Sequence, residues 1–219
     1  MNKMKTLLLA VPAILVAPFA GAATLGFTGS PEVIETVSGF NPSPDVTLDT
    51  PLTAYSTVAG NTLSGGLNLT LASGERATIS YTVLGQESGF FNYLVVEGSN
   101  IPETSTGLTT LASMTSSGLL EFGFASNRRF GTSDGPTLAI INGGLSEIST
   151  YKLGFGQITE TSDGFSVTAY FGDGTGDSDF DDIVAQIDIQ ITAVPVPAGL
   201  ALLGTGLLGF GALRRRRIS

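Results

Sequence analysis

The chain has 219 residues, a formal net charge of −9, and neither cysteine nor histidine. These two absences exclude disulfide bonds, zinc sites built on Cys or His, haem ligation by histidine, and nucleophiles of the Ser-His-Asp or Cys-His type. Composition still allows a glycosidase that works through paired carboxylates, but the chain has no tryptophan to serve as a platform for a sugar ring.

The first 22 residues have the pattern of a signal peptide. Lys3 and Lys5 form a basic start, residues 7–19 are apolar, and residues 20–22 (Ala-Gly-Ala) offer small side chains at a cleavage site. We therefore expect residues 1–22 to direct export and to be removed by cleavage after Ala22.

The segment of residues 32–62 has no clear periodicity and contains Pro42, Pro44 and Pro51. Proline cannot donate a hydrogen bond to a neighbouring strand, so it is confined to sheet edges and loops. We expect an edge strand followed by a long loop that serves as ordinary connecting chain on the surface of the body.

The expected body, residues 23–193, is long enough for one domain with its own core. Most of its segments alternate apolar and polar residues with period two, and none shows a sustained helical period. The predicted strands are residues 67–71, 77–83, 91–97, 119–124, 137–141, 151–155, 165–171 and 183–191. Short strands between glycine-containing turns indicate an all-β fold, an antiparallel β-sandwich or jelly roll.

Four turns are predicted between these strands, at residues 73–74, 134–136, 142–144 and 162–164. The last contains Asp163-Gly164, a pair that readily takes the positive φ angles of tight hairpins. We therefore expect a β-hairpin at residues 162–164 with positive φ in its turn.

Five carboxylates lie within the ten residues that precede the last predicted strand: Asp173, Asp177, Asp179, Asp181 and Asp182. Such a density of like charge is unfavourable unless a cation neutralises it. Hard oxygen ligands on a flexible loop suit Ca²⁺, which takes six to eight of them. We favour a calcium site over the alternative, a solvated acidic turn between two strands.

Two other interpretations of this loop are weaker. Asp177, Asp179 and Asp181 have the spacing that begins an EF-hand loop, but Asp182 stands where that loop needs glycine, and no flanking helices are predicted. Alternating glycines at 172, 174 and 176 could cradle a phosphate, but the surrounding carboxylates would repel an anion.

The C-terminal 26 residues have three parts. The first is the short motif Val194, Pro195, Val196, Pro197, Ala198 and Gly199. Residues 198–213 carry no charge and would span roughly 24 Å as a helix, against a hydrocarbon core of about 30 Å. Arg214, Arg215, Arg216 and Arg217 follow and would hold the end on the cytoplasmic side. We expect a short transmembrane helix rather than a buried core helix, because the run has no polar face.

This tripartite tail resembles the PEP-CTERM class of bacterial sorting signals, in its VPLPA variant, with Val196 in place of the usual leucine. The resemblance implies export in a Gram-negative bacterium and brief anchoring in the inner membrane. It also implies recognition by an exosortase-type membrane enzyme that cuts near the motif, followed by release to the cell surface or extracellular matrix.

A second resemblance covers two segments of the body. Residues 177–184 (DSDFDDIV) resemble the D-x-D-[FY]-[ND]-D-[MV]-V signature of β-sandwich domains of unknown function in exported bacterial proteins and adhesins. Residues 84–92 (LGQESGFFN) resemble the L-G-x-E-[AS]-G-[FY]-x-N segment of related PEP-CTERM proteins. The resemblance implies that the two segments meet at one end of the sandwich, where Glu87 and Asn92 would complete the calcium site.

Loss of both ends would leave four basic residues against 19 acidic ones, a net charge of −15. Such a body disfavours nucleic acid and anionic membrane surfaces as partners. The sequence predicts a structural or adhesive, non-enzymatic protein of the cell surface or biofilm matrix, and we expect an exosortase and extracellular polysaccharide as its partners. A calcium-dependent, lectin-like glycan-binding module is the alternative, and a secreted carboxylate-based hydrolase is a distant third.

Overall fold

The computed structural model describes residues 22–58, 62–87, 89–127, 138–144, 151–172 and 179–194. Within these residues the fold is all-β, with antiparallel pairing throughout and no helix, as the alternation predicted. The strands are β1 (Thr24–Phe27), β2 (Glu32–Ile34), β3 (Leu52–Val58), β4 (Thr62–Leu63), β5 (Leu67–Thr70), β6 (Glu75–Gly85), β7 (Phe91–Val96), β8 (Ser99–Pro102), β9 (Thr109–Met114), β10 (Gly118–Leu119), β11 (Phe122–Asn127), β12 (Leu138–Ile141), β13 (Lys152–Phe155), β14 (Thr159–Glu160), β15 (Gly164–Gly172) and β16 (Ile183–Ala193).

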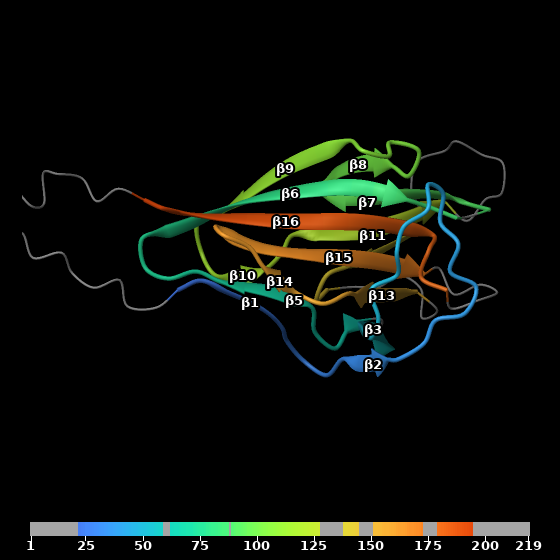
Figure 1. The fold of residues 1–219 in the computed structure, drawn as a ribbon, viewed down its shortest axis with the longest axis horizontal. Helices are drawn as coiled ribbons and strands as arrows, with labels where there is room; N and C mark the ends of the chain where they lie inside the picture. Colours follow the sequence, from blue (N-terminus) through green and yellow to red (C-terminus); the bar gives the residue numbers. More distant parts are fainter. Residues whose placement is uncertain are drawn as a thin grey trace, which may run out of the picture.

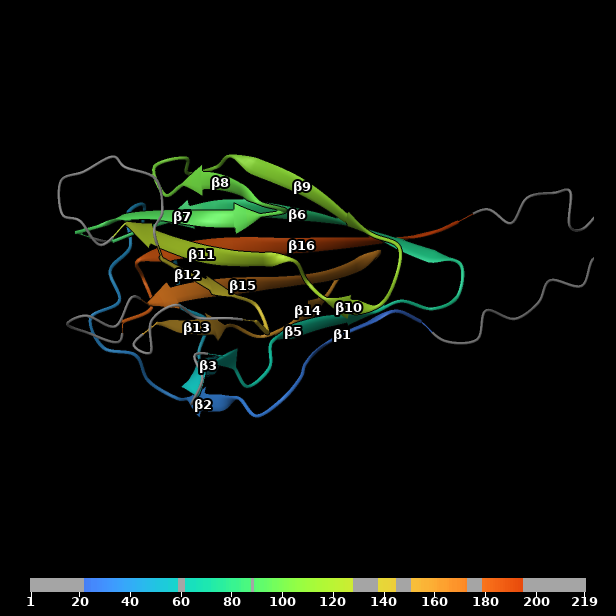
Figure 2. The same ribbon diagram turned by 180° about the vertical axis from the view of Figure 1, so that it is seen from behind.

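The described strands form two layers. The large sheet has the order β2-β3-β13-β15-β16-β6-β9, with β14 added to β15 and β4 to β3. It lies in front in Figure 1, while the sheet β12-β11-β7-β8 faces the viewer in Figure 2. A third small sheet has the order β1-β5-β10. Two packed antiparallel layers are consistent with a β-sandwich.

The main core lies between these layers because alternate residues of each strand point inward. On β6 the buried residues are at odd positions, and β16 continues the pattern in register, with Ile187 opposite Tyr81 and Ile189 opposite Ile79. The small sheets contribute aromatic side chains from the other side. The rings of Phe124 on β11 and Phe171 on β15 stack with centroids 5.3 Å apart, which ties the two layers together.

Residues 35–51, here called the strap, cross the outer face of the large sheet at one end (light blue, Figure 1). Half-buried apolar residues of the strap cover a second core cluster that contains Tyr170, Phe180 and Val184. The ring of Phe40 meets Tyr170 edge-on at 5.9 Å. The expected edge strand exists as β2, but the expectation of ordinary connecting chain is wrong, because the strap forms part of the core.

Two local expectations also need correction. Residues 119–124 were expected to form one strand, but they belong to two, β10 and β11, which lie in different sheets. The chain changes sheet at Leu120, whose amide donates to the carbonyl of Leu67 at 3.1 Å. Alternation continues across this step, so it gave no sign of the break.

The hairpin at residues 162–164 is present, and β14 pairs with β15 across it. Its turn has no positive φ, contrary to expectation. Gly164 is needed there for a different reason: a Cβ atom on it would lie 1.8 Å from the carbonyl oxygen of Ile189 on the adjacent β16. Glycine therefore allows the close approach of two strands.

Both described ends of the chain leave from the same end of the molecule, opposite the strap (Figure 1). Thr24 at the start of β1 pairs with Thr70, and the amide of Val194 after β16 donates to the carbonyl of Gly74 at 2.7 Å. Among the residues described, no helix is long and apolar enough to span a membrane. Residues 198–213, where such a helix was expected, lie outside them.

Candidate metal centre

Three carboxylates from two distant parts of the sequence lie together at the end of the large sheet that the strap covers. Glu87, Asp179 and Asp181 each place one oxygen atom within 4.8 Å of the others. Asp179 and Asp181 are buried, with 5% and 1% of their surface exposed, whereas Glu87 is exposed. The cluster therefore has a buried floor and one accessible side.

Phe180 sets the positions of its two neighbours. Its side chain is 1% exposed and packs into the second core cluster, in contact distance of Gly154, where a Cβ atom would lie 3.0 Å from the ring. Its backbone has φ +62°, a left-handed conformation that is uncommon for a bulky residue. Burial of the ring thus holds the neighbouring side chains of Asp179 and Asp181 in buried positions before β16.

The Glu87 segment is joined to the acidic segment by the backbone. The amide of Glu87 donates to the carbonyl of Asp181 at 2.7 Å. One residue earlier, Gln86 exchanges two backbone hydrogen bonds with Ser43 of the strap, at 2.8 and 3.2 Å. The structure thus brings together the two segments that the resemblance to β-sandwich domains paired.

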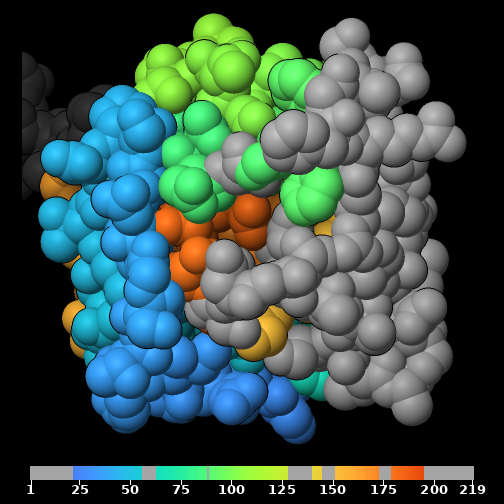
Figure 3. All heavy atoms as spheres, turned by 90° about the vertical axis from the view of Figure 1, so that its right-hand side faces the viewer, coloured from blue at the N-terminus to red at the C-terminus, as the bar shows by residue number. Residues whose placement is uncertain are grey.

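The strap completes the centre. The amide of Asn41 donates to Oδ2 of Asp181 at 2.5 Å, and Gly39, with φ +88°, lies against the side chain of Asp179. Figure 3 looks onto this end, where the segment leading into β16 (orange) lies in a hollow between the strap (blue) and the segment after β6 (green). Sequence reasoning missed Gly39 and Asn41, because a backbone amide in an unpatterned segment has no signature.

Asn92 lies beside the acidic segment but not within the group of three carboxylates. Its Nδ2 atom donates to the backbone carbonyl of Asp182 at 3.2 Å, and its own amide donates to Oε2 of Glu103 at 2.9 Å. The Oδ1 atom of Asn92 is buried and has no hydrogen-bond partner in the described part of the chain. Asn92 therefore positions the start of β16 through its hydrogen bond to the backbone carbonyl of Asp182. Asp182 is itself buried, with 6% of its surface exposed.

Glu103 is a buried carboxyl group that sequence reasoning also missed. It is 6% exposed, and burial raises its pKa to about 7, although hydrogen bonds from Asn92 lower it in part. No pattern in the sequence marks it, since it follows a proline in a short edge strand. It links β8 to the segment that carries Asn92.

We expect Glu103 to make the protein less stable as pH rises from about 4.5 to about 7. Over that range the unfolded chain has released the proton that the carboxyl group of Glu103 still binds in the folded chain. The free energy of unfolding therefore falls as the pH rises, by at most about 3 kcal/mol in total. Urea denaturation with chelator present, from pH 4.5 to 8, measures this. The difference between the wild type and Glu103→Gln should grow in favour of the variant as pH rises; a constant difference would contradict the burial argument.

Several expected site residues lie outside the described part of the chain. These are Asp173, Asp177, the motif residues 195–199, and the arginines at 214–217. Val194 is described and is 45% exposed at the end of β16. The structure therefore bears on Glu87, Asn92, Asp179, Asp181 and Asp182 from the expected set.

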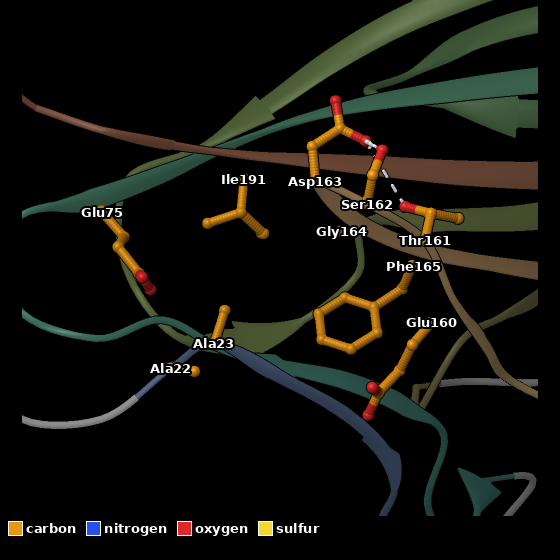
Figure 4. A pocket seen from close by; sticks show the side chains of 10 residues that line it. All are labelled: Ala22, Ala23, Glu75, Glu160, Thr161, Ser162, Asp163, Gly164, Phe165 and Ile191. Carbon is orange, nitrogen blue, oxygen red and sulfur yellow. Dashed lines mark hydrogen bonds between the residues drawn. The ribbon is translucent and has the colours of Figure 1, made fainter.

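The residues of the expected cleavage junction, Ala22 and Ala23, line a hollow of about 330 Å³ at the opposite end of the molecule. Figure 4 shows Ala23 between the side chains of Glu75 and Glu160, with Phe165 and Ile191 beside it. The hydroxyl groups of the neighbouring turn donate to Asp163, at 3.4 and 3.5 Å. The junction after Ala22 is thus at the surface, at the entry to β1.

Comparison with known proteins gave no match: no protein-family model, curated protein or solved structure resembles the chain closely enough to report. Function must therefore be inferred from the geometry. Three converging carboxylate oxygens with a buried floor form an all-oxygen donor set, which is the chemistry that Ca²⁺ prefers.

Proposed function

We propose that this is an exported bacterial protein of the cell surface or extracellular matrix, structural or adhesive rather than enzymatic, whose β-sandwich is stabilised by one calcium ion. The observation that carries the proposal is the meeting of Glu87, Asp179 and Asp181, two of them buried. Carboxylates this close repel one another, and a divalent cation between them replaces that repulsion with attraction.

Calcium is the best candidate because the donor set is made of oxygen alone and comes from loops. The three carboxylates can supply between three and six of the six to eight oxygens that Ca²⁺ takes, and water or backbone carbonyls can supply the rest. Mg²⁺ demands a stricter octahedral geometry and gives up its water reluctantly. An ion here would join the segment after β6 to the segment before β16, to which the strap is hydrogen-bonded through the amide of Asn41.

The placement of the ends supports the export part of the proposal. The expected cleavage junction and the start of the sorting tail lie at one end of the sandwich, and the metal centre lies at the other (Figures 1 and 3). A chain held in the inner membrane by residues 198–213 would therefore present the metal centre away from the bilayer. An exosortase would have access to Val194 and the motif after it, because Val194 is exposed.

The experiment is an intact-mass measurement on protein recovered from its host, with metal content determined on the same sample. We expect an N-terminus at Ala23, loss of the tail near residues 194–199, and one calcium per chain. A mass that includes residues 1–22 or 200–219 would contradict the sorting part, and a sample free of calcium after purification without chelator would contradict the metal part.

A lectin-like function is the second candidate, since Glu87 leaves one side of the centre exposed. Loop-bound calcium with an open side can take hydroxyl groups of a glycan as its remaining ligands. Binding on a glycan array that disappears with chelator would favour this function over a purely structural one.

A further inference from the structure

A second hollow lies away from the metal centre and is lined by residues of the turn after β7, the end of β9 and the start of β11. Figure 2 shows the strands β7, β9 and β11 from which these segments come. The hollow consists of two adjoining cavities of about 180 and 670 Å³ that share Glu97, Met114, Ser116 and Glu121. The smaller one reaches Tyr81, and the larger one has an apolar floor of Leu119, Phe122 and Ile141. Together they have the size of a small-molecule site.

Tyr81 gives the smaller cavity a specific chemistry. Its side chain is fully buried, and its hydroxyl group has no hydrogen-bond partner in the described part of the chain. Burial raises the pKa of Tyr81, and the carboxylates of Glu97 and Glu121 raise it further, so the group stays a neutral hydroxyl near two negative charges. A buried hydroxyl without a partner is unfavourable, so a bound molecule with a matching polar group would be stabilised here.

The backbone conformation of Glu97 also supports a binding role for this hollow. Glu97 and Gly98 form the two-residue turn between β7 and β8, with φ +49° and +78°. Turns of this kind favour Asn-Gly, because asparagine tolerates positive φ better than glutamate does. Glutamate is therefore a poor choice for the turn itself, and its unfavourable backbone conformation marks Glu97, which lines both cavities, as a candidate functional residue.

The negative charge of the residues that line the hollow favours a cationic ligand. Glu97 and Glu121 line both cavities, whereas the two basic residues in the described part of the chain, Arg76 and Lys152, line neither. A primary ammonium has three N–H donors, and three of the residues that line the smaller cavity carry side-chain acceptor oxygens: Glu97, Glu121 and Tyr81. The apolar floor beside them suits an alkyl or aryl group attached to the ammonium carbon.

We infer that this hollow binds a primary ammonium ligand with an apolar body, its N–H groups donated to Glu97, Glu121 and Tyr81 and its body on Leu119, Phe122 and Ile141. The site is independent of the metal centre, which lies at another part of the molecule. Its test can therefore fail or succeed whatever the outcome for calcium.

Octylammonium is the probe. It is titrated into the protein with chelator present, and its binding is followed by calorimetry and by changes in NMR chemical shifts. Trimethyloctylammonium, which keeps the charge but has no N–H donor, and 1-octanol, which has no charge, are the controls. We expect octylammonium to bind about tenfold more tightly than either, because charge-assisted hydrogen bonds are the stronger kind. Equal affinity for octanol would show an apolar surface only, and no binding of octylammonium would overturn the inference.

Variants locate the site. Glu121→Gln and Tyr81→Phe should each weaken octylammonium binding about tenfold, and Glu160→Gln, at the opposite end, should leave it unchanged. Glu97→Asn is the sharpest variant, because it places the preferred residue in the turn: we expect an unchanged or higher Tm together with weaker binding. If Glu97→Asn binds octylammonium as well as the wild type does, the inference is wrong.

Discussion

Calcium is expected to raise the Tm of the wild-type body by several degrees and to leave the Tm of the Asp179→Ala, Asp181→Ala double variant unchanged. An ion that binds only the folded state adds about 2.7 kcal/mol to the unfolding free energy at a hundredfold excess over its Kd. For a domain of this size that corresponds to a shift of roughly 5–10 °C. Differential scanning calorimetry in calcium and in chelator measures both proteins.

The control must remove the same charge elsewhere. The Glu160→Ala, Asp163→Ala double variant does so at the opposite end of the molecule, so its Tm should rise with calcium as the wild-type Tm does. Single substitution of the exposed Glu87 by glutamine should reduce the calcium response without removing it, since two buried carboxylates remain. An identical calcium shift in all four proteins would place the ion somewhere other than this centre.

Replacement of Phe180 by alanine is expected to lower the unfolding free energy by about 3–5 kcal/mol, the usual cost of truncating a buried phenylalanine. The ring is 1% exposed and fills the second core cluster under the strap. Because the buried ring also holds Asp179 and Asp181 in place, the calcium response should shrink in the same variant. Urea denaturation with and without calcium measures both effects.

Phe91→Ala is the matched control for that prediction. Phe91 lies on β7 with 38% of its surface exposed, so the same truncation should cost about 1 kcal/mol or less. A loss in Phe180→Ala no larger than in Phe91→Ala would mean that the acidic segment is not anchored through the core.

The alternation of apolar residues predicted the strands well but not their neighbours. The odd-numbered residues of β6 and β16 point into the core as expected, yet nothing in the sequence pairs these two strands, which are separated by about a hundred residues. The step at Leu120 is similar, since the chain changes sheet without a change in its pattern. Period two reports which face is buried, and hydrogen-bonding partners depend on the whole fold.

The candidate centre was predictable where side chains carry the chemistry. Asp179, Asp181 and Glu87 stood out as carboxylates in short motifs, and the structure brings them together. The strap was not predictable, because it acts through the amide of Asn41, the conformation of Gly39 and half-buried apolar residues without a period. Glu103 was missed for a related reason: its unusual environment comes from burial against Asn92, which appears only after folding.

The most direct test of the proposed metal centre is X-ray diffraction from crystals of the mature body grown in calcium, with anomalous differences recorded at long wavelength. We expect one anomalous peak with oxygen atoms of Glu87, Asp179 and Asp181 about 2.3–2.6 Å from it. A map with no anomalous peak at these three side chains would contradict the account, whether calcium is found at another place in the crystal or is absent from it.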